Sequence, residues 1–133
     1  MNLKRVLFLI AFMILLAACA SGVATPTVEP QGGAVYINST DLLVAESYPV
    51  QIFLRVTGDL PTPCHEFHSR VAEPDEQNRV YVTAWSESDP NTVCIQVLEP
   101  FYLSIPISME GSGEGSYTVY LNGELVGEFS YPA

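Results

Sequence analysis

Short apolar runs with a period of two set the strongest limit on the fold of this chain. From residue 34 onward, apolar residues recur at alternate positions between prolines, glycines, aspartates and asparagines. In 50–57, for example, Val50, Ile52, Leu54 and Val56 are spaced two apart. An extended chain places such residues on one face, and no stretch shows a convincing helical period. The pattern therefore predicts an all-β domain.

Turn residues divide this segment into about seven or eight short strands, a number typical of a sandwich. Asn122-Gly123 lies between two alternating runs and predicts a hairpin, because both turn positions must accept a positive φ. Pro106 lacks an N–H to donate, so its strand is expected at a sheet edge. Gly58-Asp59 is expected to end the second strand. The predicted strands are 34–37 and 42–45 (two pieces of the first), 50–57, 64–71, 79–85, 93–97, 101–107, 116–121 and 124–130.

The closing hairpin also carries a weak family likeness. Gly115, Tyr117, Val119, Asn122 and Gly123 form the pattern G-x-Y-x-V-x-x-N-G, which resembles the last hairpin of many immunoglobulin-like domains. The resemblance implies an immunoglobulin-like antiparallel β-sandwich. The chain departs from the antibody type because the positions nearest to its core disulfide, around Leu54 and Val119, are not cysteine.

The first eighteen residues have the pattern of an export signal. Lys4 and Arg5 precede the uncharged apolar run 6–18, which is shorter than the roughly 20 residues of a transmembrane helix. The run ends in Leu-Ala-Ala-Cys at 16–19, which resembles the lipobox of bacterial lipoproteins. The resemblance implies that 1–18 is a cleaved signal peptide and that Cys19 becomes the lipidated N-terminus. An ordinary signal peptide that contains a cysteine is the alternative.

The lipoprotein resemblance also implies a place for the domain. The lipid on Cys19 would anchor the chain in the outer face of the cytoplasmic membrane or in the outer membrane, with the domain extracytoplasmic. Residues 19–33 are small and rich in proline and glycine, so we expect a flexible linker there and the sandwich domain in 34–133.

Charge excludes one class of partner. Without the leader the chain keeps three arginines (Arg55, Arg70 and Arg79) against fifteen acidic residues. Such a surface repels phosphate backbones, so we expect no nucleic-acid partner. The simpler reading of the acidity is that it keeps the domain soluble.

Three cysteines fit the same scheme. If Cys19 carries lipid, Cys64 and Cys94 remain, and an oxidising compartment favours a disulfide between them. The bond would close a loop of about 31 residues, worth about 3–4 kcal/mol on the chain-entropy account.

His65, Glu66 and His68 are weak candidates for a metal site. They offer the ligand types that zinc or copper prefers, but two histidines three apart on a strand point to opposite faces. The zinc-protease spacing is missing, and a disulfide-bonded Cys64 cannot be a ligand. We therefore expect solvated strand histidines, with no metal and no cofactor.

Three functions remain open. The first is a binding module for an envelope or extracellular protein or glycan, with Tyr81 and Trp85 on one strand face as candidate contacts. Tyr120 and Phe53 are expected on outer faces elsewhere, and the stiff corner of Pro61 and Pro63 is a further candidate. The alternative for these aromatics is that their face is the core face. The second function is a purely structural envelope lipoprotein, and the third is a metal-handling domain. No G-x-S-x-G elbow or other catalytic set stands out, so we expect no enzyme.

Overall fold

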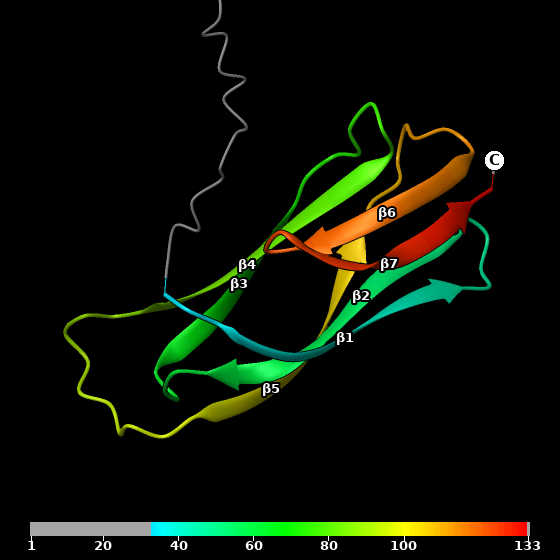
Figure 1. Cartoon of the computed structure of the whole chain (residues 1–133). Coiled ribbons are helices and arrows are strands. Elements are labelled where there is room, and N and C mark those ends of the chain that lie inside the picture. Colours follow the sequence, from blue (N-terminus) through cyan, green and yellow to red (C-terminus); the bar gives the residue numbers. More distant parts are fainter. Residues whose placement is uncertain (1–32, 133) are drawn as a thin grey trace, which may run out of the picture.

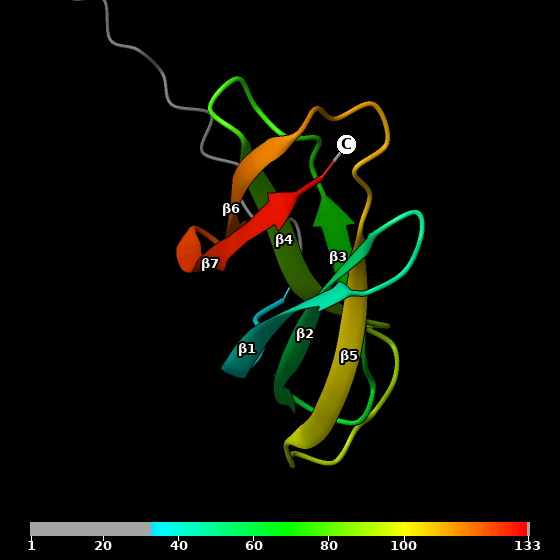
Figure 2. The ribbon, with the colours of Figure 1, turned by 90° about the vertical axis from the view of Figure 1, so that its right-hand side faces the viewer.

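The computed structural model describes residues 33–132, which form two β-sheets packed face to face (Figure 1, Figure 2). One sheet has three strands in the order β1-β2-β5, and the other has four in the order β3-β4-β6-β7. The predicted all-β sandwich is confirmed. The strands are β1 (Tyr36–Ala45), β2 (Gln51–Leu60), β3 (His65–Val71), β4 (Arg79–Ser88), β5 (Glu99–Ile107), β6 (Gly115–Leu121) and β7 (Glu124–Tyr131).

The described part of the chain contains no helix that is long and apolar enough to span a membrane. Residues 1–32 lie outside the described part of the chain. They include the expected signal peptide, Cys19 and all of the expected linker except Gly33.

The core lies between the sheets and is built from the alternation seen in the sequence. In β2 the side chains of Ile52, Leu54 and Val56 are buried, whereas Phe53, Arg55 and Thr57 are half-buried. The opposing sheet contributes Val80, Val82 and Ala84 from β4 and Tyr117, Val119 and Leu121 from β6; Ile105, Ile107, Met109 and Phe129 complete the cluster.

One pairing differs from the wholly antiparallel sandwich that the resemblance implied. β4 and β6 run parallel, with Val80 opposite Val119 and Tyr81 opposite Tyr120. After β4 the chain crosses to the other sheet for β5, then returns through 108–114 to lie beside β4 in the same direction. Parallel neighbours need such a long connection, which a hairpin pattern does not reveal.

The strand predicted at 93–97 is wrong. Residues 89–98 are a loop that leads from β4 in one sheet to β5 in the other, and Val93, Ile95 and Val97 are exposed. The alternation is present in the sequence, but among the described strands none pairs with this segment. By contrast, Pro106 does lie on an edge strand of the described sheet, since within residues 33–132 β5 pairs with β2 alone.

The ends of the first two strands also differ from the prediction. β1 is one strand with a bulge between Ile37 and Ser39, where Asn38 Nδ2 donates to Asp59 Oδ2 at 2.7 Å. β2 continues through Gly58 to Leu60, with Gly58 opposite Ile37 on one side and Phe101 on the other. Glycine is required here by close packing, and it does not end the strand.

The hairpin at Asn122-Gly123 is confirmed, with φ of 50° and 87° at the two turn positions. The side chain of Asn122 also bonds to β4, which the turn pattern does not predict. Asn122 Oδ1 accepts from the backbone N–H of Ala84 at 2.8 Å, and Nδ2 donates to the carbonyl of Ala84 at 3.0 Å. The amide therefore continues the hydrogen bonding of β4 beyond the end of β6.

We expect Gly58→Ala to destabilise the domain strongly. A Cβ at Gly58 would overlap the carbonyl oxygen of Tyr36 and lie 2.8 Å from Phe101 Cζ. A backbone atom cannot yield as a flexible side chain does, so the free energy of unfolding should fall by about 1–3 kcal/mol or more. Chemical denaturation measures this loss.

Gly113→Ala is the matched control, because nothing lies within 4 Å of a Cβ at that position. Its unfolding midpoint should stay close to that of the wild type. Equal midpoints for the two variants would contradict the close packing of β1, β2 and β5 at Gly58.

Candidate functional site

The outer face of β4 carries the aromatic residues singled out in the sequence. Val80, Val82, Ala84 and Ser86 are buried, so the intervening side chains point away from the core. Tyr81 is 38% exposed, and Trp85 is half-buried. The alternative that Tyr81 and Trp85 lie on the core face is therefore wrong.

Tyr81 stacks on Tyr120 of β6, with ring centroids 5.3 Å apart. The guanidinium of Arg79 lies 5.7 Å from the Tyr81 ring, a cation–π distance. Tyr120 was expected on an outer face elsewhere, and the parallel pairing of β4 and β6 brings it beside Tyr81. Phe53 is half-buried on β2 of the other sheet. Arg79 was not predicted, although it lies two residues before Tyr81 on β4 and alternation places both on one face.

A compact turn holds Arg79 in place. Asp75 Oδ2 accepts from Arg79 Nε at 2.7 Å, and Gln77 Oε1 accepts from Arg79 Nη2 at 2.6 Å. Asp75 Oδ1 also accepts from the backbone N–H groups of Gln77 and Arg79, each at 2.9 Å. The turn therefore fixes the position of the Arg79 guanidinium.

The ionisation of this pair follows from those contacts. Burial raises the pKa of Asp75, but the hydrogen bonds from Arg79 and Gln77 outweigh it, and the pKa lies below its usual value. The hydrogen bond to Asp75 raises the pKa of Arg79. Both groups stay charged at neutral pH.

Trp85 belongs to a second cluster on the same face. Its ring stacks on His68 of β3 with centroids 5.7 Å apart, and Nε1 donates to Glu87 Oε1 at 2.7 Å. His68 Nε2 lies 3.8 Å from the other oxygen of Glu87. We call Arg79, Tyr81, Tyr120, Trp85 and His68 together the aromatic face.

The three metal candidates are not brought together as one ligand set. His65 Nδ1 lies 2.8 Å from Thr62 Oγ1, whereas His68 packs on Trp85. Glu66 is exposed opposite Glu87. Within 33–132 no group of three or more His, Cys, Asp or Glu side chains is placed to hold a metal ion.

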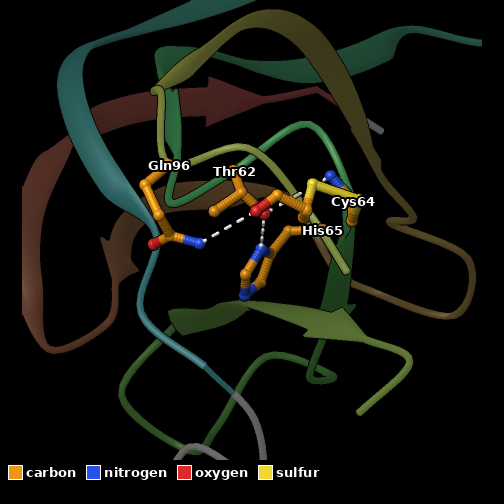
Figure 3. The surroundings of a disulfide bond; sticks show 5 residues. Thr62, Cys64, His65 and Gln96 are labelled. Atoms are coloured by element: carbon orange, nitrogen blue, oxygen red, sulfur yellow. Dashed lines mark hydrogen bonds between the residues drawn. A yellow bond between two sulfur atoms is a disulfide. The ribbon is translucent and has the colours of Figure 1, made fainter. Parts of the chain in front are cut away.

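The predicted disulfide between Cys64 and Cys94 is present, with the two Cα atoms 6.0 Å apart (Figure 3). It joins the proline corner 60–64 to the loop 89–98. Thr62 is buried in this corner, and its hydroxyl lies between the backbone N–H of Cys64 and the ring of His65. Pro61 is half-buried and Pro63 is exposed.

A turn of its own starts the disulfide-bonded loop. Asp89, Pro90 and Asn91 form a turn, in which Asp89 Oδ1 accepts from the backbone N–H of Asn91 at 2.8 Å. This hydrogen bond lowers the pKa of Asp89, so its carboxylate is charged at neutral pH. Beyond the turn, Cys94 fixes the loop to the corner.

These features define a class: a β-sandwich with one cross-link at its end and an aromatic outer face. Comparison of the sequence with known protein families agrees with the β-sandwich fold. A family model described as the ORF11 beta-sandwich domain matches residues 54–131, more than half of the chain, and the chain belongs to this family. The match runs from β2 to β7 and includes both cysteines of the disulfide. No curated protein and no solved structure matches the chain.

We expect the double variant Cys64→Ser/Cys94→Ser to unfold at a lower temperature. Without the bond the unfolded chain gains freedom, and the loss of about 2–4 kcal/mol corresponds to a melting point lower by roughly 10 °C or more. Differential scanning calorimetry measures the shift.

Wild type in a thiol reductant provides the control, and it should melt with the double variant. An unchanged melting point in both samples would contradict a stabilising bond.

Proposed function

We propose that this protein is a lipid-anchored extracytoplasmic lipoprotein whose sandwich binds an envelope or extracellular ligand through the aromatic face. The observation that carries the proposal is the outward position of Tyr81 and Trp85, with neighbours that fix their rings. Neither ring is needed to fill the core, because the opposite face of β4 does so.

The chemistry of this face suits a glycan or a protein surface. Flat rings stack on the apolar face of a sugar or pack on a partner side chain. Arg79 and Glu87 add a fixed donor group and a fixed acceptor beside the rings. Because Asp75, Gln77 and Glu87 already hold the polar groups, little side-chain entropy is lost on binding.

Two other functions have less support. A purely structural lipoprotein has no use for pre-positioned rings on its surface. A metal-handling domain needs His65, Glu66 and His68 in one cluster, and these residues make separate contacts.

The anchor is tested with the cysteine that would carry it. In bacterial cells fed a clickable palmitate analogue, the full chain should incorporate the label and sediment with membranes. Cys19→Ser should lose the label, because the acylated residue is absent, and it should leave the membrane fraction.

Cys64→Ser/Cys94→Ser is the matched control, and it should keep the label. Labelling that survives Cys19→Ser would contradict lipidation at this residue.

The aromatic face is tested by binding. We expect Tyr81→Ala and Trp85→Ala each to weaken retention of the detergent-solubilised chain on purified cell-wall glycan or immobilised envelope proteins by about fivefold or more, as hot-spot aromatics do. Pull-down titrations against each of the two probes measure the loss.

Tyr102→Ala is the control, since Tyr102 is an exposed aromatic residue on β5 of the other sheet. Equal losses for all three variants, or none for any, would count against binding through this face.

A further inference from the structure

The loop 89–98 presents an apolar surface that neither the core nor the aromatic face explains. Val93 is 98% exposed, Ile95 68% and Leu98 58%. Val97 is also exposed, and we call these four residues the apolar loop. The disulfide between Cys94 and Cys64 holds the loop to the proline corner. The position of the loop relative to the sandwich is therefore fixed at Cys94, between Val93 and Ile95.

This loop lies where the chain enters the sandwich from its N-terminal side. Gly33 donates to the carbonyl of Ser86 at 2.7 Å and accepts from its N–H at 3.1 Å. Ser86 Oγ also donates to the carbonyl of Ala34 at 2.8 Å. β4 ends at Ser88 and the loop follows, so the loop and the first described residues share one end of the molecule (Figure 1).

We propose that the apolar loop docks into the surface of the lipid bilayer that holds the anchor. The inference rests on the proposed function, in which Cys19 carries the lipid. A chain of the length and composition of 19–33 has a root-mean-square span of about 20 Å as a flexible linker. An anchor at Cys19 therefore keeps the end that carries Gly33, and with it the apolar loop, within reach of the bilayer.

Because the chain would be held at the membrane by its lipid, even a weak affinity of the loop for the bilayer is sufficient for docking. Four aliphatic side chains give a free protein little affinity for a membrane, but an anchored chain meets the same surface at a high effective concentration. Docking adds a second contact to the lipid and fixes which end of the sandwich faces the membrane. The β1–β2 turn, with Tyr48, then lies at the far end (Figure 1).

Charge sets the kind of bilayer. Glu87 and Glu99 flank the loop, Asp89 begins it, and the mature chain has no lysine to offset these charges. These carboxylates repel anionic headgroups, so docking favours a zwitterionic surface. This preference is opposite to that of proteins that bind membranes through basic patches.

The test places a tryptophan in the loop of the full lipidated chain. In a Trp85→Phe background, Val93→Trp reports on the loop, and Val44→Trp, another exposed valine, reports on the opposite end of β1. Both proteins are reconstituted into vesicles of brominated phosphatidylcholine, whose bromines quench a nearby indole. We expect emission from the loop variant to be quenched and blue-shifted, and emission from the control to be unchanged.

Lipid composition provides a second readout. In vesicles rich in brominated phosphatidylglycerol at low salt, quenching of the loop variant should fall, and added salt should restore it. Ile95→Trp repeats the measurement if the first variant does not fold.

The outcomes separate the two proposals. Mass spectrometry that finds no lipid on Cys19 overturns the proposed anchor and this inference with it. A lipidated chain whose loop tryptophan is as unquenched as the control overturns the docking alone, and a protein partner then becomes the occupant of the loop.

Discussion

The packing of β2 against β4 and β6 is the constraint on which the rest of the structure depends. Leu54, Val56, Val80 and Val119 are fully buried where the sheets meet. Burial of each such side chain is worth about 1.5–3 kcal/mol, more than any surface contact of this domain supplies. Because side chains alternate along a strand, fixing Val80 and Val82 inward also fixes Tyr81 and Trp85 outward. The candidate binding surface is thus a consequence of the core.

Local pattern predicted much of the fold. Alternation located six of the seven strands and suggested the two pieces of β1, and Asn122-Gly123 located the last hairpin. The wrong predictions all depended on contacts between residues far apart in the sequence. Val93, Ile95 and Val97 have a strand pattern without a neighbouring strand, and Gly58 looks like a terminator until Tyr36 and Phe101 are seen beside it. For the aromatic face, the sequence located Tyr81 and Trp85 on one strand and Tyr120 on an outer face elsewhere. That Tyr81 and Tyr120 stack on each other became visible only with the parallel pairing of β4 and β6.

The cross-link and the loop are best understood together. A sandwich whose chain passes from one sheet to the other after β4 needs a connection, and here that connection is long, apolar and tied down at Cys94. A loop without the bond would be free to collapse onto the protein or to associate with other chains. The bond joins Cys94, which lies between Val93 and Ile95 in the sequence, to the corner that contains Thr62. The stability of the domain and the position of the apolar loop therefore depend on the same two cysteines.

The side chain of Asn122 is one of three groups that complete an edge of β4. Along one side, β4 is bonded in turn to the backbone of β6, to the Asn122 amide at Ala84 and to Gly33 at Ser86. Three unlike partners together complete an edge that none of them is long enough to cover. An uncovered edge invites pairing with another molecule. The folded unit therefore includes Gly33, ahead of its own first strand, and a fragment trimmed to Tyr36 would present an open stretch of β4 at Ser86.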